Sequence, residues 1–99
     1  MIAVIGTFRF PVEALDQVCP LMREVIEATR TEPGCHAYSY AQDIGDPGLF
    51  HVTEIWESRE ALAAHFETPH MREWAARREK AGFSDRRIAL HELGPGEAI

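Results

Sequence analysis

Two histidines and a tryptophan that lie close together in the chain are the residues best suited to chemistry. Trp56 ends an apolar segment, and His65 and His70 follow it on either side of Thr68-Pro69. An imidazole can take a proton from a phenol near neutral pH, and an indole can form the wall of an aromatic pocket. A helical histidine more often has a structural role, and a strand tryptophan more often fills a core. These residue types alone leave both interpretations open.

Three further aromatic side chains alternate along a second segment. His36, Tyr38 and Tyr40 are two residues apart, so in a strand they share one face. That face points either into a pocket or into an interface between subunits. His51 and His91 face away from the tryptophan or lie on the last expected strand, and we interpret them as structural.

The chain lacks the residue spacings that usually hold a metal or a nucleotide. It has no His-x-His, His-Glu-x-x-His or paired-cysteine motif, and the five-residue step from His65 to His70 is awkward for one helix face. It has no Gly-x-Gly-x-x-Gly or Gly-x-x-x-x-Gly-Lys loop either. We therefore expect no metal and no organic cofactor.

Charge and hydropathy exclude several classes of partner. A net charge of −6 repels phosphate backbones, and no basic run is interleaved with stacking aromatics, so we expect no nucleic acid partner. Six of the ten basic residues lie between Arg72 and Arg87, where a solvated helix face is the ordinary interpretation and an anion site the alternative. No apolar run approaches the ~20 residues of a membrane span, so we expect no membrane association.

Length and cysteine content bear on domain organisation and compartment. A chain of 99 residues, 45% of them hydrophobic, predicts one domain over residues 1–99, with a core over 2–92 and a tail over 93–99. Cys19 and Cys35 are not at Cys-x-x-Cys spacing, and the residues after Met1 lack the basic segment of a signal peptide. We therefore expect a cytoplasmic protein.

The elements that must position these residues follow from apolar periodicity and turn residues. The pattern predicts strands over residues 2–10, 35–42, 49–56 and 86–93, and helices over 12–31 and 59–80. Pro20 predicts a kink or a later start in the first helix. Ser58 can cap the second helix, and Thr68-Pro69 predicts a break within it. The order of elements is that of an α+β, ferredoxin-like split βαβ fold with an antiparallel sheet.

Both faces of the first expected strand carry apolar residues. Ile2, Val4 and Phe8 lie on one side, and Ala3 and Ile5 lie on the other. The helices can cover only one face of the sheet, so something else must cover the second. A small domain gains from added apolar burial, and we therefore expect a homodimer.

Two segments resemble the antibiotic biosynthesis monooxygenase family, and within it the quinol monooxygenases that act without a bound cofactor. They are Glu32–Tyr38 and Glu54–Met71. The resemblance implies a dimeric α+β barrel in which two sheets pack together, with a pocket in each subunit between sheet and helices. It also implies that Trp56 lies against a bound aromatic substrate and that His36 and Tyr38 orient a substrate hydroxyl. The chain has no asparagine, so the mechanism of members that use an asparagine in the third strand does not carry over.

The leading hypothesis is a cofactor-independent monooxygenase that oxidises a quinol or related hydroxyaromatic molecule with O₂. In it, His65 and His70 are the catalytic candidates, and Trp56, His36 and Tyr38 bind the substrate. One alternative is an isomerase of a small, phosphorylated metabolite on the same fold, with an anion site among the arginines. The other is a non-catalytic dimer that binds a small apolar ligand.

Overall fold

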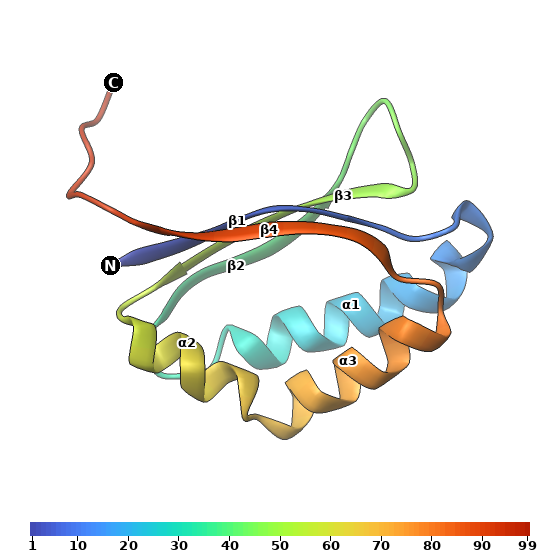
Figure 1. The fold of residues 1–99 in the computed structure, drawn as a ribbon, viewed down its shortest axis with the longest axis horizontal. Coiled ribbons are helices and arrows are strands. Elements are labelled where there is room, and N and C mark those ends of the chain that lie inside the picture. Colours follow the sequence, from blue (N-terminus) through green and yellow to red (C-terminus); the bar gives the residue numbers. More distant parts are fainter.

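Four antiparallel strands form one sheet, in the order β2-β3-β1-β4, and the helices cover one of its faces (Figure 1). The computed structural model describes residues 1–99. In chain order the elements are β1 (Ile2–Arg9), the short 3-10 helix η1 (Val12–Ala14), α1 (Leu15–Thr29), β2 (Cys35–Gln42), β3 (Leu49–Trp56), α2 (Arg59–Phe66), α3 (Pro69–Lys80) and β4 (Ser84–Glu92). This confirms the expected α+β, ferredoxin-like fold.

Helix α1 begins later than its apolar pattern alone indicates. Pro11 is followed by the single 3-10 turn η1, and the α-helix starts at Leu15 and continues through Pro20. Proline removes the hydrogen bond that residue 20 would donate to the carbonyl of Asp16. Both residues are exposed, so water can bind that carbonyl instead. The expected start later than Val12 is confirmed, and the helix continues through Pro20.

Two hydroxyl side chains fix the start of each helix in the second half of the chain. The Ser58 hydroxyl accepts the Ala61 N–H at 3.1 Å, and the Thr68 hydroxyl accepts the Met71 N–H at 3.3 Å. Pro69 occupies the first position of α3, where its missing N–H costs nothing. The expected break at Thr68-Pro69 is confirmed, and it separates the end of α2 from the start of α3.

Strand β2 contains a bulge next to its first residue. Cys35 pairs with Trp56 and Ala37 pairs with Ile55, which leaves His36 as an extra residue between the two pairs. His36 is exposed and bonds to the Glu57 carboxylate at the rim of the sheet, whereas Tyr38 is buried. The expectation that His36 shares a face with Tyr38 and Tyr40 is therefore wrong, because one added residue changes the alternation.

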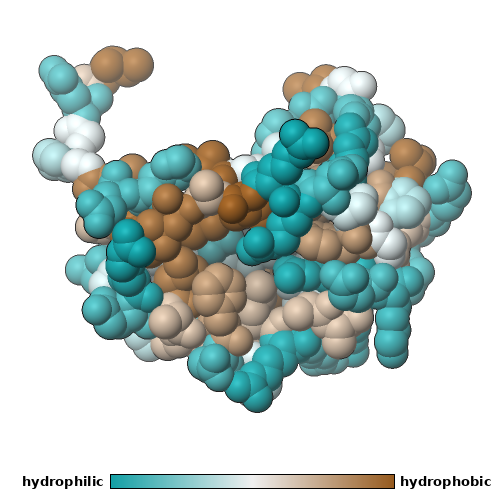
Figure 2. Space-filling model, viewed as in Figure 1, coloured by the Kyte–Doolittle hydropathy of each residue, from teal (hydrophilic) through white to brown (hydrophobic).

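The core lies between the sheet and the helices in two adjoining parts. One part is built around Phe8, Phe50 and Trp74, and the other around Trp56 and Leu62. Figure 2 shows hydrophobic residues reaching the surface between strand β4 and the helices, among hydrophilic ones. None of the helices has the length and apolar character that a membrane crossing requires.

The opposite face of the sheet is not covered by any helix of the chain (Figure 1). Ile5 lies on it and is 49% exposed. Its cross-strand neighbours are Thr53 on β3 and Ala89 on β4. We call this surface, centred on Ile5, the outer face.

Candidate functional site

One carboxylate connects the two histidines that the sequence singled out. Glu32 lies in the turn after α1, and its Oε2 is 2.8 Å from Nδ1 of His65 and 2.8 Å from Nε2 of His70. The carboxylate is 10% exposed, His65 is 1% exposed, and His70 is 28% exposed. The break at Thr68-Pro69 makes this possible, since it turns α3 so that both imidazoles reach the same oxygen.

The second ring nitrogen of His65 has no partner. When Nδ1 donates its proton to Glu32, Nε2 of the neutral ring keeps a free lone pair. This Nε2 is buried and accepts no hydrogen bond. Burial lowers the pKa of His65, and the hydrogen bond and charge of Glu32 oppose that effect only in part. His65 is thus held as a neutral imidazole with an unused acceptor, which is the state that a general base requires.

Aromatic rings surround that imidazole. The His65 ring centroid lies 4.9 Å from that of Trp56, 5.4 Å from that of Tyr38 and 5.5 Å from that of Phe66. Phe66 is 47% exposed, so it is the only one of these three rings that faces solvent to a large extent. His65 therefore packs against one partly exposed ring, that of Phe66, and two buried ones.

Trp56 holds a buried acid that sequence reasoning did not select as a site residue. Its indole N–H donates to Oε1 of Glu54 at 2.9 Å, and Glu54 is 7% exposed. Burial raises the pKa of Glu54 to about 7, although the bond from Trp56 and the charge of Arg86 act in the opposite direction. Val52, Glu54 and Trp56 alternate along β3 on one face, and this alternation is the signal that could have identified the glutamate.

Tyr38 and Tyr40 form a pair of hydroxyls on the inner face of β2. Their oxygens are 2.6 Å apart. Burial raises the pKa of Tyr40 to about 12, and it raises the pKa of Tyr38 further. Both hydroxyls are therefore neutral at physiological pH, and the pair can donate one hydrogen bond and accept others.

A cavity lies between these tyrosines and the helices. Its volume is only about 20 Å³, room for about one water molecule, so a ring-sized ligand enters only when the side chains around it move apart. Its polar lining consists of Tyr38, Tyr40, Glu54, Arg78 and Arg86. Its remaining lining is apolar: Val4, Phe8, Val52, Phe66, Met71, Phe83 and Ile88. This composition suits a small ring that carries polar substituents.

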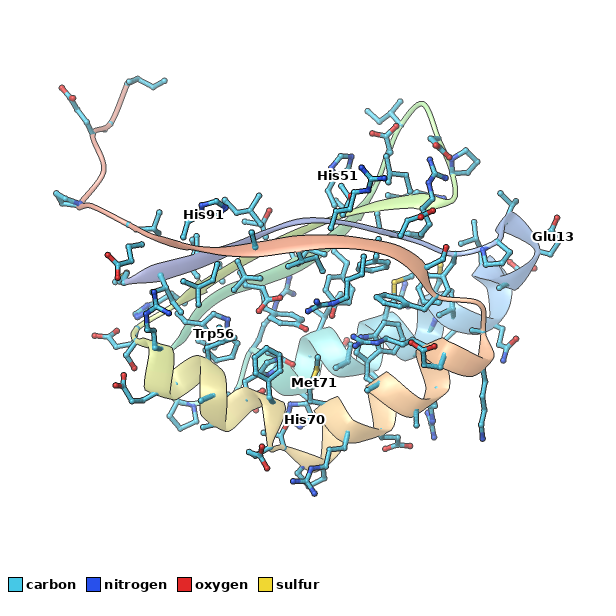
Figure 3. The ribbon with its side chains drawn as sticks, in the orientation of Figure 1. Glu13, His51, Trp56, His70, Met71 and His91 are labelled. Carbon is cyan, nitrogen blue, oxygen red and sulfur yellow. The ribbon has the colours of Figure 1, made fainter.

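The structure brings some of the expected site residues together and separates others. Tyr38 lines the cavity, and Trp56 and His65 pack against Tyr38 without lining the cavity themselves. His70 joins them through Glu32, and His36 lies apart at the rim with Glu57. In Figure 3, Trp56 and His70 project into the layer between sheet and helices.

Two further histidines lie on the other side of the sheet. Figure 3 shows His51 and His91 beyond the sheet, away from Trp56. His51 bonds to the Asp43 carboxylate at 2.8 Å near the turn between β2 and β3. His51 and His91 therefore both lie away from the tryptophan, and His91 is also on the last strand, which agrees with the expectation that they face away from it or lie on that strand.

Glu32, His65 and His70 also form a group that could hold a metal ion. One ligand atom from each lies within 4.8 Å of the others. The five-residue step from His65 to His70 is awkward only along one helix, and here the two histidines lie on different helices, so this part of the expectation is wrong. The three side chains bond to one another in this arrangement, which already satisfies the carboxylate.

Comparisons with known proteins agree with this architecture. The family model described as antibiotic biosynthesis monooxygenase matches residues 1–77. A crystal structure from Deinococcus radiodurans, itself assigned to such a monooxygenase only provisionally, has a TM-score of 0.93 at 27% identity, covering 100% of this chain and 98% of that one. A second crystal structure, described as an antibiotic biosynthesis monooxygenase, has a TM-score of 0.88 at 37% identity, covering 96% and 100%.

A curated relative is longer than this chain. The uncharacterized protein sll1783 of Synechocystis is 34% identical over 73 residues, which are 74% of this chain and 50% of that protein. The chain thus spans about half the length of the curated relative that it matches.

Proposed function

The chain belongs to the antibiotic biosynthesis monooxygenase family, and we propose that it is a cofactor-independent monooxygenase that oxidises a quinol or related hydroxyaromatic molecule with O₂. The observation that carries this proposal is the free, buried Nε2 of His65. Its other nitrogen is held by Glu32, and a cavity with aromatic walls begins at the neighbouring Tyr38. Such a group can deprotonate a phenol without any cofactor.

The reaction balances with O₂ as the only oxidant. His65 takes a proton from a ring hydroxyl, and the resulting anion passes one electron to O₂. The two radicals combine at a neighbouring ring carbon and form a carbon–oxygen bond to a peroxide. That carbon then loses its hydrogen as a proton while the oxygen–oxygen bond breaks. One oxygen atom stays on the ring as a carbonyl, and the other leaves as water, so the product is a hydroxylated quinone.

The other residues position the base and the ring in this proposal. Glu32 fixes the tautomer of His65, and His70 supports Glu32 from the start of α3. Trp56 and Tyr38 give the site its aromatic shape. His65 does not line the cavity, so we propose that a substrate hydroxyl reaches Nε2 when Phe66 turns outward, because Phe66 is half exposed, packs against His65 and lines the cavity. Glu54 lines the cavity directly and is the second candidate for the base.

Oxygen uptake with and without the candidate base tests the function. A panel of quinols is assayed aerobically and anaerobically, with quinone absorbance and O₂ consumption followed together. His65→Gln is expected to lower the rate by about 10²–10⁴-fold, and raising the pH restores part of it because the phenol then ionises unaided. His51→Gln, which removes an exposed histidine bonded to a carboxylate, is the matched control. Equal rates in the parent and in His65→Gln would transfer the role of base to Glu54.

A second function is favoured by the two arginines that line the cavity. Arg78 and Arg86 could bind a phosphate, as an isomerase of a phosphorylated metabolite would need. Such an isomerase converts its substrate equally well under nitrogen. Turnover without O₂ would therefore contradict the monooxygenase and support the isomerase. Binding without any turnover would support a non-catalytic ligand-binding protein.

The outer face fits a second copy of this chain. Ile5 is half exposed there, and no helix covers it. Packing two outer faces together would bury Ile5 on both subunits and would form the dimeric α+β barrel. We further place the reaction in the cytoplasm, because both cysteines are free thiols.

A further inference from the structure

Two arginines of the cavity have no carboxylate partner. Arg78 on α3 and Arg86 on β4 take part in no salt bridge, although the chain has 16 acidic and 10 basic residues. Other arginines do pair with acids: Arg9, Arg59, Arg72 and Arg77. Arg23, Arg30 and Arg87 form no salt bridge either, so what sets Arg78 apart is the burial of its guanidinium Nε in the cavity rather than the missing partner alone.

Arg78 is the more constrained of the two. Its Nε is buried and has no hydrogen-bond partner, and its guanidinium lies 4.5 Å from the ring centroid of Phe83. Burial lowers the pKa of Arg78, yet a guanidinium stays charged in proteins. A charge removed from water without an anion is unfavourable, and a ligand anion would offset that cost.

The acid in the same cavity does not supply this anion. Glu54 lies near enough to Arg86 for the two charges to interact, but its carboxylate accepts the Trp56 N–H and forms no ion pair with either arginine. Tyr38 and Tyr40 carry no charge at physiological pH, since burial raises the pKa of both. The cavity therefore keeps excess positive charge.

We propose that the substrate is a hydroxyaromatic acid whose carboxylate is bound by the guanidinium of Arg78 with the help of Arg86. This inference rests on the proposed function for the ring and its hydroxyls, and it adds the acidic substituent. A guanidinium presents parallel N–H donors that match the two oxygens of a carboxylate. Arg86 is exposed and lines the cavity, so an acid that approaches from the side of β4 meets it first.

Binding without oxygen tests the acid group separately from the reaction. The dissociation constants of gentisate, its methyl ester and hydroquinone are measured by calorimetry under nitrogen. The parent protein is expected to bind gentisate about 10–100-fold more tightly than the ester, which is the range for a hydrogen bond to a charged group. Arg78→Gln is expected to abolish this preference and to leave the affinity for the ester unchanged.

Two variants act as controls for the arginine. Arg78→Lys keeps the charge but loses the paired donors, so it is expected to retain part of the preference. Arg87→Gln removes the neighbouring arginine of β4, which pairs with Thr7 and does not line the cavity, and it is expected to change nothing. If Arg78→Gln does not fold, as judged by circular dichroism, Arg86→Gln gives the same test and is expected to weaken the preference.

The outcomes separate this inference from the proposed function. Equal affinity of the parent for gentisate and its ester overturns the acid subsite, even if hydroquinone is oxidised. Tight binding of gentisate that depends on Arg78 supports the subsite, even if no oxidation follows and the monooxygenase proposal fails. Competition by phenyl phosphate that is stronger than that by gentisate overturns the carboxylate and favours the phosphorylated substrate. An equal loss of turnover on hydroquinone and gentisate in Arg78→Gln, with unchanged KM, assigns the arginine to the phenolate and overturns the subsite.

Discussion

The buried carboxyl of Glu54 should make the stability of this protein depend on pH in a direction opposite to that of most acids. Burial raises its pKa from the ordinary value of 4.5 to about 7. A carboxyl with a raised pKa in the folded state contributes fully below the unfolded value and loses that contribution as pH rises through the folded value. The window for Glu54 therefore runs from about pH 4.5 to about pH 7.

The magnitude follows from the two pKa values. Each pH unit between them corresponds to about 1.4 kcal/mol, so ionising Glu54 costs the folded state about 3 kcal/mol by pH 8. Glu54→Gln keeps an oxygen that can accept the Trp56 N–H but cannot ionise. Relative to the parent, this variant is expected to gain about 3 kcal/mol in unfolding free energy between pH 4.5 and pH 8.

Urea unfolding at several pH values checks this expectation. The parent, Glu54→Gln and the tail variant Glu97→Gln are followed by tryptophan fluorescence, and the difference between variant and parent is plotted against pH. The difference isolates Glu54 from His65, whose lowered pKa makes the protein lose stability as pH falls below about 6.5. A difference for Glu54→Gln that stays constant between pH 4.5 and pH 8 would refute the reasoning, because the carboxyl would then have the same pKa in the folded and unfolded states.

Four further predictions follow from the same structure. Loss of rate in His65→Gln should be accompanied by loss of the acidic limb of the pH–rate profile, measured as kcat against pH; an unchanged profile would show that another group is titrating. Light scattering at micromolar concentration should give the mass of a dimer for the parent and of a monomer for Ile5→Lys; a monomeric parent would contradict the dimeric α+β barrel. Elemental analysis and an absorption spectrum should find no stoichiometric metal, flavin or haem, whereas zinc retained after desalting would show that Glu32, His65 and His70 form a metal site. Gly6→Ala should lower the free energy of unfolding in urea by about 1–3 kcal/mol, because an added Cβ would lie 2.0 Å from the Arg87 carbonyl oxygen; an unchanged free energy would contradict the close approach of β1 and β4.

Local sequence signals were sufficient for most of the fold. The alternation of Val52, Glu54 and Trp56 predicts an inward face of β3, and Ser58 and Thr68 predict the two helix starts, since each depends on neighbouring residues only. The dimer stays a prediction, because a single chain does not contain the partner surface.

The site depends on contacts that no local pattern carries. Glu32 meets His65 and His70 from 33 and 38 residues away, after a helix break whose angle the sequence does not specify. The bulge at His36 arises from the register between β2 and β3. Both features reflect pairing across the fold, so the position of His36 was predicted wrongly and the role of Glu32 was not predicted.

The order of the strands leaves β4 at one border of the sheet, with a row of backbone groups that have no neighbouring strand. Such a border invites pairing with other chains and the growth of aggregates. Here the strand carries Asp85, Arg86, Arg87 and Glu92, so a second copy aligned beside it would bring ionised side chains into close contact. Arg86 therefore has a use apart from any ligand: replacing it and Arg87 together by valine is expected to make the protein aggregate during refolding.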